Sequence, residues 1–382
     1  MIKIGRERRS ELRDDDKIRW NPYYRIVKLT PDEIYITHGL RSVYSFSIVD
    51  NKELHVIGKM TDMLQSSVSL KDLVNNLNLS SKHIPYINET IESFYKKGII
   101  VRENECFLPY YQVHYKTLPT LSNANIGLIG AGFIGMRVVQ NILSMQVGKS
   151  IMIADDRKIS NKEIESKNFL FFLMDGACGD RSNYIHILAK YLQRFETLGD
   201  KVEIQYFNVL DEQTLKNILR SSDITIIGME RYHPRLFSEI NLLAHEEKAS
   251  ILYSFVDGSL GIVGPLVIPG ETACYTCMEA SLESSMTNPF AFTTFKTFME
   301  KQEEYGENQS LSGIPPLYDI VSGFVVDSFI RFFLSGDSVP IINRALIIDF
   351  ESLEMDLQDI LKIPGCPACS TFGIPQMSPT AL

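Results

Sequence analysis

Two C-x-x-C pairs, Cys274–Cys277 and Cys366–Cys369, lie 88 residues apart in this chain of 382 residues. Each pair can place two thiolates on one tetrahedral Zn²⁺ ion, and four such ligands leave no open coordination position, which is typical of a structural zinc site. A dithiol redox motif is the alternative, but it usually needs one pair rather than two. The pattern therefore predicts a fold in which the C-terminal segment returns to residue 274.

The composition limits the classes of molecule that the protein is expected to bind. A formal net charge of -9 argues against nucleic-acid binding, which needs a basic face to displace counterions from phosphates. The charged N-terminus lacks the apolar core of a signal peptide, and no run of about 20 apolar residues could span a bilayer. We therefore expect a cytoplasmic protein whose six cysteines are reduced, so that metal ligation is considered before disulfides.

The spacing of apolar residues changes from a strand period to a helix period along the first part of the chain. After a predicted charged arm over residues 1–19, three short alternating segments predict a small sheet. They are residues 25–29, 33–37 and 43–48. Apolar residues at helical spacing then predict three helices, the second with Ser69 as its N-cap. We expect a winged-helix-like α+β domain over residues 20–108.

The second part alternates strand and helix. A segment without a clear period, Cys106 to Ser122, contains two prolines and marks the boundary. The strands are predicted at residues 125–129, 150–154, 202–207, 224–228 and, as the last one, 345–350. The helices are predicted at residues 133–145, 182–195, 213–219 and 320–333. Such alternation predicts an α/β fold over residues 118–382, a doubly wound, mostly parallel Rossmann-like sheet that carries the zinc knuckles.

A glycine motif lies between the first strand and helix of this domain. In Gly130-Ala131-Gly132-Phe133-Ile134-Gly135, the missing side chains would let backbone N–H groups and the helix dipole approach a phosphate. Asp155 and Asp156, at the end of the next strand, are placed to accept hydrogen bonds from a ribose. Tight packing alone for the glycines, and a solvated turn for the aspartates, are the alternatives.

In order and spacing, these motifs resemble the ThiF/MoeB/ubiquitin-activating superfamily, and within it the MccB-like enzymes that adenylate a peptide in microcin biosynthesis. The resemblance runs from about Asn125 to Cys369 and includes Gly264-Pro265-Leu266-Val267-Ile268-Pro269-Gly270 before the first knuckle. It implies a homodimer that binds Mg-ATP and activates a carboxylate as its acyl adenylate. It also implies a substrate-covering crossover loop in the polar stretch from Leu282 to Gly313.

The same resemblance suggests catalytic residues, although the family's own residues are replaced. Lys167 would serve where the family has a phosphate-binding arginine, and Arg181 where it has a lysine. Glu230 matches the aspartate that holds Mg²⁺. Each replacement keeps the sign of the charge, but an ATP-inactive scaffold that presents a peptide to a partner enzyme remains the alternative. A nicotinamide oxidoreductase would share the glycine motif and leave the two knuckles unexplained.

No cysteine lies between Cys277 and Cys366, where thioester-forming relatives keep their nucleophile, so capture of the adenylate by an enzyme thiol is not expected. The front domain resembles the PqqD-like elements that bind the leader of a ribosomally made precursor peptide as an added strand. The strand at residues 43–48 and the helix at residues 84–94 would hold it. A DNA-binding winged helix is the alternative. Among such fused proteins, the chain resembles the pantocin-forming enzymes of antibiotic biosynthesis, which activate a glutamate side chain of their precursor.

Overall fold

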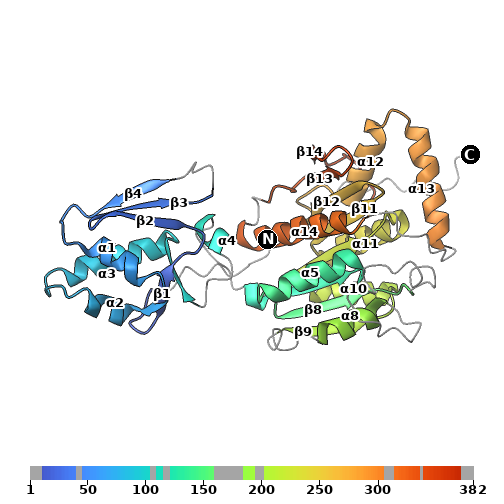
Figure 1. Cartoon of the computed structure of the whole chain (residues 1–382). Helices are drawn as coiled ribbons and strands as arrows, with labels where there is room; N and C mark the ends of the chain where they lie inside the picture. The colour runs from blue at the N-terminus through green and yellow to red at the C-terminus, as the bar shows by residue number, and fades with distance from the viewer. Residues whose placement is uncertain are drawn as a thin grey trace, which may run out of the picture. The chain divides into compact units, whose positions relative to one another are not determined.

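The computed structural model describes residues 11–39, 45–103, 109–114, 121–158, 184–193, 202–304, 314–335 and 339–370. The chain forms two compact units, Met1–Thr120 and Leu121–Leu382 (Figure 1). The division falls within the segment from Cys106 to Ser122, whose prolines and lack of period predicted a boundary. Among the described residues, no helix has the length and apolar composition needed to cross a membrane.

The first unit contains two small antiparallel sheets. One has the order β2-β3-β4, formed by Arg25–Thr30, Glu33–Thr37 and Phe46–Val49, and its alternation buries Ile34 and Ile36 completely. The other has the order β5-β1-β6, formed by Val68–Ser69, Lys17–Trp20 and Ile100–Arg102. This second sheet was not predicted because its strands are only two to four residues long. Three residues of the segment predicted as an arm, Lys17 to Arg19, belong to β1, in which Ile18 is fully buried.

Four helices lie within the described part of the same unit. They are α1 Val56–Met63, α2 Leu70–Asn76, α3 Ile84–Lys96 and α4 Pro109–His114. Ser69 caps α2 as predicted, because its side chain accepts a hydrogen bond from the Asp72 N–H at 3.1 Å. Apolar faces of α1, α2 and α3 close the core beneath Ile34 and Ile36. The winged-helix-like description of this unit stays a prediction.

The second unit is built on an eight-stranded, mostly parallel sheet of the order β14-β13-β12-β11-β10-β7-β8-β9. The parallel strands are β7 Asn125–Ile129, β8 Ser150–Ala154, β9 Glu203–Phe207, β10 Ile224–Met229 and β11 Ile251–Asp257. The antiparallel strands are β12 Leu260–Val267, β13 Arg344–Asp349 and β14 Glu354–Asp359. The predicted α/β fold with a mostly parallel sheet is therefore confirmed.

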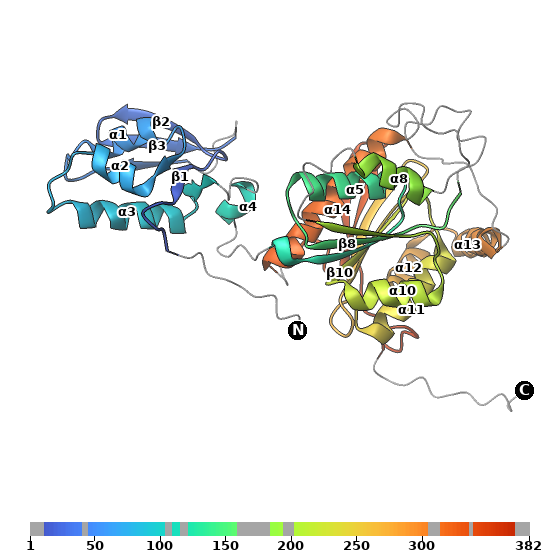
Figure 2. The same ribbon diagram turned by 90° about the horizontal axis from the view of Figure 1, so that it is seen from below.

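Helices cover both faces of this sheet (Figure 2). One face carries α5 Phe133–Ser144, α8 Tyr184–Gln193 and α14 Pro315–Ser335. The other carries α10 Glu212–Ser221, α11 Pro234–Glu247 and α12 Tyr275–Ser285. Strands β7, β8 and β10 are buried along almost their whole length, as expected for strands covered on both faces.

Two sequence expectations in this unit were wrong. The stretch predicted as a polar loop from Leu282 to Gly313 is helical as far as Glu304, in the end of α12 and in α13 Pro289–Glu304. The Asn288-Pro289 dipeptide starts α13, because Asn288 accepts a hydrogen bond from the Ala291 N–H and proline suits a first helical position. The strand at residues 344–349 is not the last, because β14 follows it at the sheet edge.

Candidate functional site

The glycine loop joins β7 to the start of α5, and two of its glycines serve chain packing. Gly130 has a positive φ of 106°. A Cβ at Gly130 would overlap the Gly228 carbonyl oxygen, and one at Gly135 would overlap the Gly130 carbonyl oxygen. These two glycines let α5 pack closely against β7 and β10. The first turn of α5 therefore lies at the carboxyl ends of the parallel strands.

Gly132, the N-cap of α5, faces a different neighbour. A Cβ at Gly132 would overlap both carboxylate oxygens of Glu230, which follows β10. The Ile134 N–H donates a hydrogen bond to Glu230 Oε1 at 3.1 Å. A buried carboxylate, 1% exposed, therefore occupies the start of α5, where the helix dipole favours negative charge.

Asp155, after β8, holds the other side of the loop. The Ala131 N–H donates to Asp155 Oδ2 at 2.7 Å, and Asp155 itself is 0% exposed. Arg157 Nη2 and Nε donate to the two oxygens of Asp155 at 2.6 and 3.0 Å. Arg157 Nη1 donates to Glu230 Oε2 at 2.8 Å. One guanidinium thus bridges two carboxylates that both accept hydrogen bonds from the glycine loop.

The bridge is well shielded from water. The Arg157 side chain is 12% exposed, and its guanidinium lies 5.0 Å from the centre of the Tyr184 ring at the start of α8. Although burial opposes its charge, the carboxylates of Asp155 and Glu230 raise the pKa of Arg157 well above its ordinary value. The guanidinium is therefore a permanent cation at this position.

A cavity of about 360 Å³ opens beside Arg157. It is lined by Asp156, Arg157, Lys158, Leu210, Met229, Arg231, His233, Leu236, Gln302 and Glu303. Burial and the neighbouring Asp155 raise the pKa of Asp156. Burial, with the charges of Arg231 and Arg157, lowers the pKa of His233, which is therefore a neutral imidazole at pH 7. The cavity combines cations, a partly buried carboxylate and apolar walls at the carboxyl ends of β8 and β10.

Helix α13 forms one wall of this cavity and is held in place at both ends. Near its C-terminus, Glu303 accepts hydrogen bonds from the Arg235 and Leu236 N–H groups in the first turn of α11, at 3.4 and 3.1 Å. Closer to its N-terminus, Lys296 donates to Glu279 of α12 at 2.7 Å. Glu279 also accepts from the hydroxyl of Tyr232 at 2.7 Å, so α13 is connected to the segment that carries Glu230.

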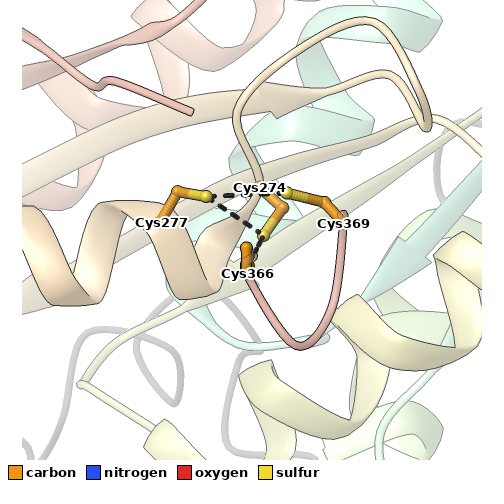
Figure 3. A group of neighbouring side chains, drawn as sticks. All are labelled: Cys274, Cys277, Cys366 and Cys369. Atoms are coloured by element: carbon orange, nitrogen blue, oxygen red, sulfur yellow. Dashed lines mark hydrogen bonds between the residues drawn. The ribbon is translucent and has the colours of Figure 1, made fainter. Parts of the chain in front are cut away.

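The four cysteines of the two pairs meet between the start of α12 and a loop after β14 (Figure 3). Their Sγ atoms lie within 4.8 Å of one another, with neighbouring distances of 3.8, 3.7 and 3.6 Å. Tetrahedral zinc with Zn–S bonds of about 2.3 Å requires Sγ separations of about 3.8 Å. All four side chains are buried, and the Ile363 N–H donates to Cys277 Sγ at 3.4 Å. The cluster therefore fits a tetrahedral metal ion.

The structure brings some of the predicted site residues together. Gly132, Asp155 and Glu230 meet around the start of α5, whereas Asp156 turns into the cavity. Lys167 and Arg181 lie outside the residues that the structure describes. Arg157 was not singled out from the sequence, and the available signal was a cation directly after the acidic end of β8. The nucleotide, phosphate and magnesium roles of all these residues stay predictions.

Known structures share this architecture. The chain is similar to Escherichia coli MccB with MccA-N7isoASN, at 15% identity and a TM-score of 0.59 over 92% of this chain and 99% of that one. It is equally similar to MccB with ATP, at 15% identity and a TM-score of 0.58 over 93% and 100%. A heterocyclase solved with substrate and cofactor matches 93% of this chain but 40% of its own, at 12% identity and a TM-score of 0.57. These likenesses establish the fold.

Comparisons of sequence find fewer matches than the comparisons of structure. No curated protein matches the chain. The model of the ThiF family matches residues 108–369, more than half of the chain, and this range contains the glycine loop, Glu230 and all four clustered cysteines. The resemblance to the superfamily predicted from the motifs is thereby confirmed, and the chain belongs to the ThiF family.

Proposed function

We propose that the protein uses ATP to activate a carboxylate of a ribosomally made precursor peptide as its acyl adenylate, in the biosynthesis of a peptide antibiotic. The observation that carries this proposal is the cavity beside Arg157, whose lining offers a carboxylate for a ribose, apolar walls for a base and cations for phosphates. MccB, which the chain matches over nearly its full length, has been solved with ATP and with the peptide MccA.

In this mechanism Asp156 binds the ribose, and the loop of Gly130, Gly132 and Gly135 admits the phosphates. Lys167 and Arg181 neutralise the triphosphate, while Glu230 would hold Mg²⁺, whose chemistry is to offset negative charge between the phosphates. The peptide carboxylate attacks the α-phosphorus, and pyrophosphate leaves. No general base is needed, because a carboxylate is already a nucleophile. The protein supplies position and charge neutralisation. A nucleophile within the peptide then displaces AMP.

The clustered cysteines would hold a structural zinc ion. The four buried thiols leave no ligand position for a substrate, so the ion would fasten the segment after β14 to α12 and take no part in the reaction. Burial raises the pKa of Cys274 to about 11. A bound cation would offset this cost, because metals bind the thiolate form.

The precursor's leader would bind to the first unit, as in PqqD-like elements. Strand β4 lies at the edge of the β2-β3-β4 sheet, and its residues are mostly exposed, so its outer hydrogen-bonding edge is a template for an added strand. Helix α3 would contact the other side of the leader. We place the leader along residues 43–48 and 84–94, in a homodimer that binds neither nucleic acid nor membrane. The pantocin-forming enzymes are the expected functional relatives.

One observation favours a second function, an ATP-inactive scaffold that binds a leader and presents it to a partner enzyme. The loop N–H groups of Ala131 and Ile134 both donate to carboxylates of the protein itself. A triphosphate would need at least one of these donors. The heterocyclase, 40% of whose length matches this chain, contains the same fold within a larger enzyme.

Calorimetric titration of the zinc-loaded protein with ATP and magnesium separates the two functions. For the enzyme we expect micromolar binding, which Arg181→Ala weakens by about 1 to 3 kcal/mol, the free energy of a charged hydrogen bond. Glu212→Gln, in an exposed ion pair on α10, is the matched control and leaves binding unchanged. Pyrophosphate release would then be measured with the precursor peptide. If the intact protein binds no nucleotide, the scaffold function is favoured.

A further inference from the structure

The carboxylate of Glu230 occupies the space that Gly132 leaves open. In a nucleotide-binding glycine loop, a missing side chain lets a phosphate approach the first turn of the helix. Here both Glu230 oxygens lie where a Cβ of Gly132 would be, and Oε1 accepts the Ile134 N–H at 3.1 Å. A phosphate at this position and the Glu230 carboxylate would therefore need the same space and the same donor.

The charges around the loop also oppose a phosphate while Glu230 is in place. Asp155 and Glu230 contribute two negative charges, and Arg157 contributes one positive charge, so the buried group carries a net negative charge. An incoming phosphate would add further negative charge at contact distance in a shielded environment, where repulsion is strong. If Glu230 turned away, Arg157 would keep Asp155 and present Nη1 to the new anion instead.

We propose that Glu230 is a built-in anion that occupies the phosphate position of the glycine loop, so that a nucleotide binds only when the Glu230–Arg157 ion pair opens. This inference rests on the proposed nucleotide site. It assigns Arg157 as the cation that exchanges a carboxylate for a phosphate. It is compatible with a later role of Glu230 at Mg²⁺, because a side chain released from the loop is free to reach a metal bound to the phosphates.

Titration with ADP in the absence of magnesium tests the competition without the metal role. Glu230→Gln keeps the shape and an acceptor for the Ile134 N–H but removes the charge. We expect it to bind ADP about tenfold more tightly than the wild-type protein, because a repelling buried charge is gone. Glu247→Gln removes another largely buried carboxylate, which pairs with Arg220 at the C-terminal end of α11, and serves as the matched control with unchanged affinity. Equal or weaker binding by Glu230→Gln would overturn the inference and leave the nucleotide site itself intact.

A second measurement decides the inference even if no nucleotide binds. In Glu230→Ala the anion position is vacated, and inorganic phosphate should raise the melting temperature of this variant by several degrees while leaving the wild-type protein and Glu247→Ala unchanged. If neither ADP nor Mg-ATP binds to any form but phosphate stabilises Glu230→Ala, the proposed enzyme fails and the resident anion stands. If phosphate stabilises none of the proteins, Glu230 is not a substitute for an anion.

Discussion

Asp155 and Asp156 are neighbours in the sequence but lie in different surroundings. Asp155 is fully buried, and both its oxygens accept hydrogen bonds from the loop or from Arg157. Asp156 lines the cavity. The two residues were predicted together as ribose ligands, which stays a prediction for both, and in the structure Asp155 holds the loop and Arg157. This separation can be tested by replacing each carboxylate with an amide.

We expect Asp155→Asn to lower the free energy of unfolding by about 3 kcal/mol, because it leaves part of the buried Arg157 charge without a partner. Asp156→Asn should change stability by less than about 0.5 kcal/mol and weaken nucleotide binding instead. Chemical denaturation of both variants gives the comparison. Equal losses of stability would show that the two carboxylates do not differ in this way.

The cysteine cluster makes a prediction about metal content. Cys369→Ser should reduce bound zinc from about one ion per chain to near zero and lower the melting temperature, because three thiolates hold structural zinc much more weakly than four. Cys178→Ser, which changes a cysteine outside the two pairs, is the control and should keep its zinc. Metal analysis of the purified proteins measures the content. Full zinc in Cys369→Ser would contradict the assignment of ligands.

Spacing alone was enough to predict the cysteine cluster, because two C-x-x-C pairs suit one tetrahedral ion wherever the intervening chain runs. The contact between Arg157 and Glu230 could not be predicted in this way. It depends on β8 and β10 both lying beside β7. The order of the strands in the sheet cannot be read from the alternation of strands and helices along the chain. Local motifs therefore identified the individual groups, whereas the pairing of charges required the sheet.

At the scale of elements, α13 shows how local chemistry can be misread. Its aromatic and β-branched residues have modest helix propensity, and Phe290 and Phe298 are exposed, so no buried apolar stripe indicates a helix. Strand β14 was missed for a related reason, since its six residues are all exposed and include Glu354, Asp356 and Asp359. Strands β7, β8 and β10 and helix α5 had clear periods and were predicted to within one residue, whereas the buried strands β11 and β12 were not predicted.

The attachment of α13 to α11 should depend on pH. Burial raises the pKa of Glu303 to about 7, above the value of about 4.3 expected in the unfolded chain. The folded protein then binds this proton more tightly, so the free energy of unfolding should fall as pH rises from about 4 to about 7. The side chain of Glu303→Gln cannot ionise, so the fall in the free energy of unfolding should be smaller for this variant by up to about 3 kcal/mol.

Urea denaturation at pH 5 and pH 7.5 tests this dependence on wild-type protein and Glu303→Gln. Glu246→Gln, on the exposed side of α11 and paired with Lys216, is the control and should follow the wild-type protein. Parallel curves for all three proteins would mean that the Glu303 proton is not linked to folding.

At the scale of the whole molecule, the two units have separate cores, and the cysteine cluster belongs to the second one. We therefore expect two calorimetric unfolding transitions. A strong chelator should lower only the transition of the second unit, because binding free energy at a structural zinc site is folding free energy. Separately expressed first unit would identify its transition. A single transition that moves as a whole with chelator would contradict independent folding.

The position of Cys366 and Cys369 also sets an order of events during synthesis. Helix α12 and most of the large sheet emerge from the ribosome with only half of the clustered thiols present, so the cysteine cluster can close only after residue 369 has been made. The residues of the first unit are complete long before then, and N-terminal units generally fold first. A nascent chain can therefore present a folded first unit while the second still lacks half of its cysteine cluster.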